Sequence, residues 1–254
     1  MSKLGDGELH LGATNLVDAT NFIIQESLNK TGLSIRFVNS YSLGLCVTSS
    51  DYRKTISQKG LNLPDGKPLI WSWRVFHHDE KIRASQLRGV DVLRSVLENS
   101  QTDQRHLFLG STDFTLAELE LRVRETYPNV NIAGFINPGK VTNGSHDVSN
   151  LFRIVTESQA NIVWVSLGTP LQDEITTVLS RTLPGTFIGV GAAFGFLSGT
   201  NDESPPRMNR LGLEWVFRLV KEPRRLWKRY FIFSPLGVFF SCSKKVKWEA
   251  LVLS

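Results

Sequence analysis

Hydrophobic positions along the chain fall into short apolar runs that are separated by longer amphipathic stretches. The runs are rich in Val, Ile, Leu and Phe, which favour extended backbone, and they are bounded by Gly, Asn or Ser. They predict five β-strands, at residues 34–39, 106–111, 130–136, 161–168 and 186–191. The last two are apolar almost throughout, as expected of strands that are buried on both faces of a parallel sheet.

Helical periodicity fills the segments between these strands. Residues 51–60 end at a glycine, residues 112–128 begin at a capping Thr112 or Asp113, and residues 170–184 are bracketed by prolines. Strands that alternate with amphipathic helices predict an α/β fold, a Rossmann-like parallel sheet with flanking helices. Several loops would then leave the carboxyl ends of strands, where open α/β sheets bind their ligands.

One of these loops, "GVGAAFGF", places Gly189, Gly191 and Gly195 directly after an apolar strand. Glycines at such a point let the backbone approach a phosphate while a helix N-terminus faces it. The spacing departs from the dinucleotide fingerprint, and no obvious ribose-binding acid follows about 20 residues on. Tight packing of strand on helix explains the glycines equally well, and a dinucleotide-dependent oxidoreductase is the alternative function.

Asp65 lies in the Pro-Asp-Gly turn of "LNLPDGKPLIW", just before an apolar stretch. A turn and helix cap is the simpler interpretation, because Asp and Gly are common turn residues. A carboxylate in a cleft is also a candidate general base, and Asn39, which leaves an earlier strand, is placed to share that cleft. The local pattern leaves both interpretations open.

The histidines and cysteines predict no metal site. His77 and His78 are adjacent and would point in different directions on a helix, and the remaining histidines show no ligand spacing. Cys46 and Cys242 lie far apart, which indicates a reducing, cytoplasmic location without a disulfide framework. The start of the chain lacks the features of a signal peptide. The longest uncharged apolar run, residues 230–242, is too short to span a bilayer and long enough to touch one.

Positive charge is concentrated near the end of the chain. Eleven Lys and Arg against three Glu give residues 207–254 a charge of +8, so the net +5 of the whole chain leaves −3 for residues 1–206. We therefore divide the chain into an α/β catalytic body, 1–206, and a helical, basic appendage, 207–254. Such asymmetry indicates phosphate, nucleic acid or anionic lipid as a partner.

The segment "RLGLEWVFRLVKEPRRLWKRYF", residues 210–231, carries most of this charge. Four of its cations recur at helical spacing along one face: Arg218, Lys221, Arg225 and Lys228. Pro223 is expected to end one helix near Glu222 and to begin another. Trp215 and Leu219 are expected to pack the first helix against the body.

Four blocks of the sequence together resemble the WecG/TagA/CpsF family of bacterial glycosyltransferases. They are "LPDG" at 63–66, "SLGTPLQDE" at 166–174, "GVGAAFGFLSG" at 189–199 and "RLGLEWVFRLVKEPRRLWKRY" at 210–230. The resemblance, which covers nearly the whole chain, implies an inverting, metal-independent transferase without a cofactor. Its donor would be a UDP-sugar, often of N-acetylmannosamine, and its acceptor a polyprenyl-diphosphate-linked sugar such as undecaprenyl-diphosphate-N-acetylglucosamine. Such enzymes make surface polysaccharide or cell-wall polymers.

The same resemblance implies partners and a location. An anionic membrane surface on the inner face of the cell membrane is expected to hold the protein peripherally, through its appendage. Nucleic acid is not expected as a partner, and a second copy of the chain is left open as one.

Site residues follow position by position from the resemblance. Asp65 would be the general base that deprotonates the acceptor hydroxyl, with Asn39 in the same pocket. The nucleotide-sugar site would be shaped by residues of the two glycine-containing blocks: Gly168, Pro170, Gln172, Gly189, Gly191 and Phe194. Three cations of the appendage would hold diphosphate or lipid phosphate: Arg218, Arg225 and Arg229.

Three positions depart from the family pattern. A threonine common two residues before Asn39 is Phe37 here, so a hydroxyl contact to a sugar is missing, which Ser40 or Ser42 would have to supply. Gly195 stands where an acid is common, and Asp173 where Glu is usual. These changes are expected to affect the specificity for the donor or acceptor sugar more than the transfer reaction itself. A non-enzymatic module that binds membrane or nucleic acid is the second alternative.

Overall fold

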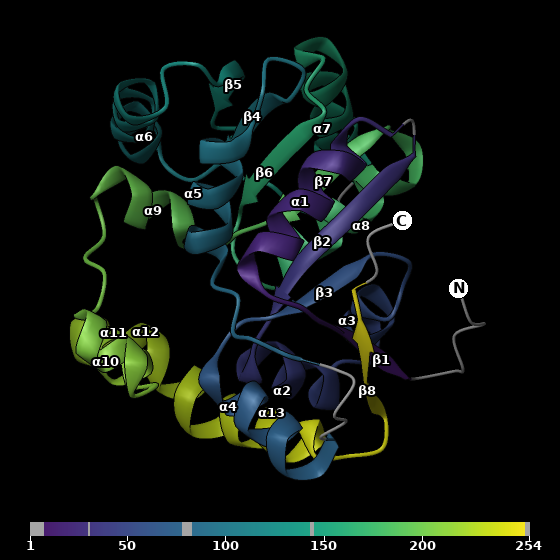
Figure 1. Cartoon of the computed structure of the whole chain (residues 1–254), viewed down its shortest axis with the longest axis vertical. Coiled ribbons are helices and arrows are strands. Elements are labelled where there is room, and N and C mark those ends of the chain that lie inside the picture. The colour runs from purple at the N-terminus through teal and green to yellow at the C-terminus, as the bar shows by residue number, and fades with distance from the viewer. Residues whose placement is uncertain (1–7, 30, 78–82, 143–144, 252–254) are drawn as a thin grey trace.

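A six-stranded parallel sheet forms the centre of the protein (Figure 1). The computed structural model describes residues 8–29, 31–77, 83–142 and 145–251. The strand order of the sheet is β3-β2-β7-β6-β4-β5. The strands are β2 (Gly32–Val38), β3 (Leu61–Pro64), β4 (Arg105–Gly110), β5 (Asn131–Ile136), β6 (Ile162–Ser166) and β7 (Gly185–Gly189).

Helices cover both faces of this sheet, and each face has its own apolar core. One face packs against α1 (Leu16–Ser27), α5 (Gly89–Asn99), α6 (Asp113–Thr126) and α9 (Ala193–Ser198). The other packs against α7 (Ser145–Ser158) and α8 (Leu171–Thr182). The predicted α/β fold is confirmed, and Thr112 caps α6 as expected, since its hydroxyl accepts a hydrogen bond from the Thr115 amide (3.2 Å).

All five predicted strands are present, but three short strands were not predicted. These are β3 and the pair β1 (Leu9–Ala13) and β8 (Val246–Ala250), which form a parallel two-stranded sheet from the two ends of the chain. β3 has only four residues, and β1 and β8 lack the continuous apolar run by which the five-residue β6 and β7 were predicted. β8 pairs with β1 from the other end of the chain. The helix predicted at residues 51–60 is the shorter α3 (Ser50–Ile56), which begins one residue earlier and ends four residues sooner.

The basic segment 207–254 returns to the body as a series of short helices. They are α10 (Pro206–Arg210), α11 (Glu214–Lys221), α12 (Pro223–Lys228), the π-helical turn η2 (Arg229–Phe233) and α13 (Ser234–Ser241). The predicted break at Pro223 is confirmed, because α11 ends two residues before it and α12 begins on it. The expectation that Trp215 and Leu219 pack α11 against the body is wrong for Trp215, which is exposed on the cavity wall, whereas Leu219 is half-buried. No side chain of α11 is fully buried.

The contact that fixes this segment lies between α13 and α2 (Ser40–Thr48). A Cβ at Gly237 would lie 1.8 Å from the carbonyl oxygen of Ser40, and one at Gly44 would lie 2.0 Å from that of Phe233. Only glycine permits backbones to approach so closely.

Within the described ranges, no helix combines the length and the apolar composition needed to cross a bilayer. The division of the chain at residue 206 stays a prediction.

A buried polar network supports the beginning of α8. The Tyr52 hydroxyl donates to Asp173 Oδ2 (2.7 Å), and the fully buried Arg36 donates from Nη1 to the Thr55 carbonyl (2.8 Å) and to Thr177 Oγ1 (3.2 Å). Burial raises the pKa of Asp173 to about 6, against the hydrogen bond from Tyr52 and the charge of Arg36, which lower it. The network holds Asp173 in place beside the predicted site residue Gln172.

Replacing Tyr52 with phenylalanine should lower the free energy of unfolding by about 1–3 kcal/mol, because a buried carboxylate loses its donor. The loss should be largest above pH 6, where Asp173 is ionised, and should shrink as the pH falls below that value. Urea denaturation between pH 5 and pH 8 measures it. Tyr127→Phe is the matched control, and equal stability of Tyr52→Phe and wild type at pH 8 would contradict the prediction.

Candidate active site at the carboxyl ends of strands β2 and β3

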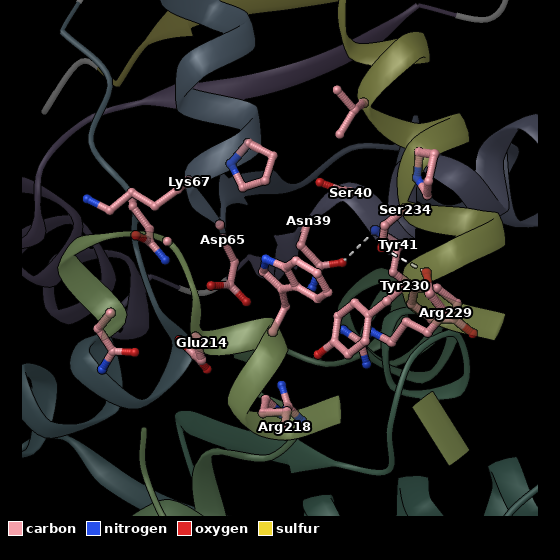
Figure 2. A pocket seen from close by; sticks show the side chains of 18 residues that line it. Asn39, Ser40, Tyr41, Asp65, Lys67, Glu214, Arg218, Arg229, Tyr230 and Ser234 are labelled. Carbon is pink, nitrogen blue, oxygen red and sulfur yellow. Dashed lines mark hydrogen bonds between the residues drawn. The ribbon is translucent and has the colours of Figure 1, made fainter. Parts of the chain in front are cut away.

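A cavity of about 280 Å³ lies between the body and the basic segment (Figure 2). From the body, the wall comes from the start of α2, the turn after β3, the start of α4 (Lys67–Ser72) and the segment before α5. These residues are Asn39, Ser40, Tyr41, Asp65, Gly66, Lys67, Pro68 and Gln86. From the basic segment come Asn209, Gly212, Glu214, Trp215, Arg218, Arg229, Tyr230, Ser234, Pro235 and Val238. Five of the predicted site residues therefore meet here, from opposite ends of the chain.

Asn39 forms the N-cap of α2 and lines the cavity at the same time. Its Oδ1 accepts hydrogen bonds from the backbone amides of Tyr41 (3.0 Å) and Ser42 (3.2 Å), which fixes the orientation of the side chain. Because the oxygen is used inside the protein, the Nδ2 amino group is the part of Asn39 that can donate to a ligand. Ser40 lies beside it on the cavity wall.

Asp65 points its carboxylate into the cavity from the turn after β3 (Figure 2). Its backbone amide donates to the Val38 carbonyl (2.7 Å), which ties this turn to the end of β2. The helix-cap interpretation is not supported, because the N-cap of α4 is Gly66 and no side chain caps that helix. Burial raises the pKa of Asp65 to about 6, and the negative charge of Glu214 acts in the same direction.

Two arginines of the basic segment face Asp65 across the cavity (Figure 2). The guanidinium of Arg229 lies 4.6 Å from the centre of the Tyr41 ring, and its buried Nε has no hydrogen-bond partner among the described residues. Burial lowers the pKa of Arg229. Arg218 lies 5.8 Å from the Phe196 ring on α9, and both arginines oppose the rise in the pKa of Asp65. With Lys67 and Glu214, the cavity wall thus carries three cations and two carboxylates.

Glu214 is a cavity residue to which the sequence gave no role. It lies beside Asp65, and its Oε2 pairs with Arg88 Nε at 3.3 Å (Figure 2). Arg88 also pairs with Glu203 at 3.3 Å, so the pair belongs to a larger network at the start of α5. Glu214 stands in the quoted "GLEW" block, which was the only sequence signal for it.

Trp215 and Tyr230 form a second unpredicted feature, an aromatic pair on the cavity wall. Their ring centres lie 5.7 Å apart with planes at 53°. Flat apolar faces beside polar donors suit the ring of a sugar, which exposes C–H groups on its faces and hydroxyls at its edge.

The remaining predicted nucleotide-site residues gather around Gln172, outside this cavity. Gln172 Oε1 accepts from the amides of Gly191 (2.9 Å) and Gly168 (3.2 Å), so it joins the loops after β6 and β7. Gly189 also packs against the Gln172 side chain, and Pro170 immediately precedes α8.

Two further predicted residues, Phe194 and Arg225, lie outside the cavity. Phe194 is fully buried against Phe108, with ring centres 5.7 Å apart, so it is a core residue. Arg225 is exposed, forms an ion pair with Glu222 and does not line the cavity. No group of three or more His, Cys, Asp and Glu suited to a metal ion occurs in the described part of the chain.

Comparison with known proteins decides the family. The model of the glycosyl transferase WecG/TagA/CpsF family matches residues 8–250. The chain belongs to this family. It is 27% identical over 219 residues to the N-acetylglucosaminyldiphosphoundecaprenol N-acetyl-beta-D-mannosaminyltransferase of Bacillus subtilis (strain 168), a match that covers 85% of this chain and 82% of that protein. A protein of the same name from Bacillus spizizenii (strain ATCC 23059 / NRRL B-14472 / W23) is 28% identical over 180 residues, 70% of this chain and 66% of that protein.

Membership of the WecG/TagA/CpsF family confirms the resemblance and gives the three departures a structural setting. Phe37 is buried in the core between β2 and α5, where a Cβ on Gly89 would lie 3.5 Å from its ring. A Cβ at Gly195 would lie 2.2 Å from Asn201 Nδ2, so the amide of Asn201 fills the space of a side chain at that position. Asp173 serves the buried network and does not reach the cavity.

Replacing Glu214 with glutamine should lower the pKa of Asp65 below its value of about 6, because a neighbouring negative charge is removed. Arg88 would at the same time lose a partner and act more strongly on Asp65, in the same direction. Carbon-13 NMR titration of the Asp65 carboxyl measures the pKa, with assignment by loss of the signal in Asp65→Asn. Glu222→Gln, in the same segment and outside the cavity, is the control. An unchanged pKa in Glu214→Gln would contradict the assigned cause.

Proposed function

We propose that this protein transfers a sugar from a UDP-sugar to the sugar of a polyprenyl-diphosphate-linked acceptor, as a step in cell-wall or surface-polymer synthesis. N-acetylmannosamine is the proposed donor sugar and N-acetylglucosaminyl-diphosphoundecaprenol the proposed acceptor, because the names of both relatives specify them. One observation carries the proposal: the Asp65 carboxylate and the cations Arg218 and Arg229 face the same cavity. Family membership favours this reaction over the oxidoreductase alternative.

In the proposed reaction, ionised Asp65 takes the proton of the acceptor hydroxyl as that oxygen attacks the anomeric carbon of the donor. The bond from the anomeric carbon to the UDP oxygen breaks on the opposite side, which inverts the configuration. A pKa of about 6 leaves Asp65 mostly ionised at neutral pH while making it a better proton acceptor than an ordinary carboxylate. Negative charge then accumulates on the departing diphosphate.

Arg218 and Arg229 are proposed to receive this charge. Arginine binds phosphate oxygens in a bidentate manner and remains charged on burial. Arg229 is suited to the role, because stacking on Tyr41 orients its guanidinium and its buried Nε has no partner among the described residues. The nucleoside is proposed to lie toward the Gln172 cluster, since the loops after β6 and β7 open at the same edge of the sheet.

The basic segment is proposed to hold the protein peripherally on the inner face of the membrane. Its charge of +8 favours anionic lipid, and a lipid-linked acceptor requires the cavity to work at a membrane surface. A role for Arg225 is proposed here as well, toward lipid phosphate rather than in the cavity, because its side chain is exposed.

Replacing Asp65 with asparagine should lower turnover by about 10²–10⁴-fold, the usual effect of losing a general base. UDP release is measured with purified protein, UDP-N-acetylmannosamine and a lipid-diphosphate-N-acetylglucosamine analogue, and then with other UDP-sugars. The Bacillus subtilis relative is assayed in parallel to show that the conditions support transfer. If wild-type protein releases no UDP from any donor while the relative does, the proposed function is wrong.

Replacing Arg229 with glutamine should lower kcat by about 10²-fold or more, the scale seen when one donor to a developing anion is removed. The reduction should appear mainly in kcat, because charge on the diphosphate grows toward the transition state. Arg153→Gln is the matched control, as Arg153 is an exposed arginine on α7 that pairs with Glu157. A change confined to KM would show that Arg229 binds ground-state substrate only.

A further inference from the structure

Exposed apolar side chains from two distant parts of the chain lie on neighbouring helices. Val75 (72% exposed) and Phe76 (61%) belong to the π-helical turn η1 (Trp73–His77), which continues α4. Phe239 (82% exposed) belongs to α13, and other large exposed apolar residues of the same region are Trp71, Trp227, Phe231, Ile232 and Leu236. Figure 1 shows α4 and α13 together at the lower end of the molecule, away from α6 and α7. We call residues 67–77 and 223–241 the apolar platform.

Buried polar contacts join the two halves of the platform. Ser241 Oγ donates to Ser72 Oγ (2.8 Å), and His77 Nε2 is hydrogen-bonded to the Ser241 carbonyl oxygen (2.8 Å). Ser72 and Ser241 are both buried. These hydrogen bonds hold the α4–η1 helix against α13, which in turn packs backbone to backbone against α2.

The charges around the platform indicate which class of partner it binds. Residues 67–77 and 223–248 contain no Asp or Glu, although the whole chain has 24. They contain nine cations: Lys67, Arg74, Arg224, Arg225, Lys228, Arg229, Lys244, Lys245 and Lys247. A second copy docked through this face by twofold symmetry would bring like charges together, which costs free energy. Acids stand only at the borders of these ranges, and one of them, Glu222, pairs with Arg225. Apolar side chains among predominantly positive charge match an anionic lipid surface, where headgroups lie above hydrocarbon.

The platform is also continuous with the cavity. Lys67 and Pro68 of α4 and Val238 of α13 line the cavity wall. Trp71, one turn further along α4, packs against Gly212 on the opposite rim, since a Cβ there would lie 3.0 Å from its ring. Insertion of the platform about 5–10 Å into the headgroup region of a bilayer would therefore hold the cavity near the headgroups.

We propose that α4–η1 is a second membrane-binding element, outside the basic segment, whose Val75 and Phe76 enter an anionic bilayer beside Phe239. The consequence for catalysis rests on the proposed function: the element sets the height of the cavity so that the diphosphate of a lipid-linked acceptor meets Arg218 and Arg229. Vesicle binding itself requires no sugar transfer.

The first test is co-sedimentation of the full chain with vesicles of phosphatidylcholine containing phosphatidylglycerol. The double variant Val75→Ser, Phe76→Ser should bind at least about tenfold more weakly than wild type, because two large apolar side chains no longer enter the interface. Phe114→Ser, Leu121→Ser is the matched control, because these α6 residues are similarly exposed (68% and 65%) outside the platform. Thermal unfolding of each variant verifies that it is folded.

Equal vesicle binding by the double variant and wild type overturns the proposal. So does a wild-type dimer in sedimentation equilibrium that the double variant loses, since the face would then bind a second copy. The second test compares a short, water-soluble acceptor with a polyprenyl acceptor in vesicles: the double variant should keep turnover on the first and lose about tenfold on the second. If no UDP is released from any donor, the proposed function fails while the co-sedimentation result still decides the membrane element.

Discussion

Close backbone contact between α2 and α13 is the constraint on which the site depends. Gly44 and Gly237 let these helices meet without intervening side chains, and a Cβ at either would overlap a carbonyl oxygen of the other segment. The cap of α2 is Asn39, and the turn before α13 carries Arg229. The contact therefore brings a polar group of the body to a cation of the basic segment, although nearly 200 residues separate them in the sequence.

The electrostatics of the cavity follow from this arrangement. Asp65 loses solvent when the basic segment covers it, which raises its pKa, and the same segment brings Glu214 on one side and two arginines on the other. These charges act in opposite directions, so the carboxylate stays close to the proton affinity that a general base requires at neutral pH. Burial also disfavours the charged form of Arg229 and lowers its pKa. Substrate diphosphate would relieve that cost by supplying a counter-charge.

The sequence predicted what depends on local patterns and missed what depends on distant contacts. Apolar runs gave five of the six strands of the central sheet, Thr112 gave the cap of α6, and Pro223 gave the break in the basic segment. It placed Asp65 and Asn39 in one cleft only as one of two alternatives. Pairing of β1 with β8, and the position of Glu214 beside Asp65, leave no local signature because they join the two halves of the chain. Phe194 was assigned to the nucleotide site on a motif, whereas packing against Phe108 explains it.

The two parts of the basic segment are held by different contacts. Residues of α13 and β8 are anchored by backbone contact with α2 and by pairing with β1, whereas α11 buries none of its side chains. It contacts the body through polar and aromatic groups: Glu214 pairs with Arg88, and the Arg218 guanidinium lies over the Phe196 ring. The wall that carries Glu214, Trp215 and Arg218 is thus held by these contacts rather than by a packed apolar core. A ligand that bridges Asp65 and Arg218 would add a further contact between this wall and the body, and would stabilise both.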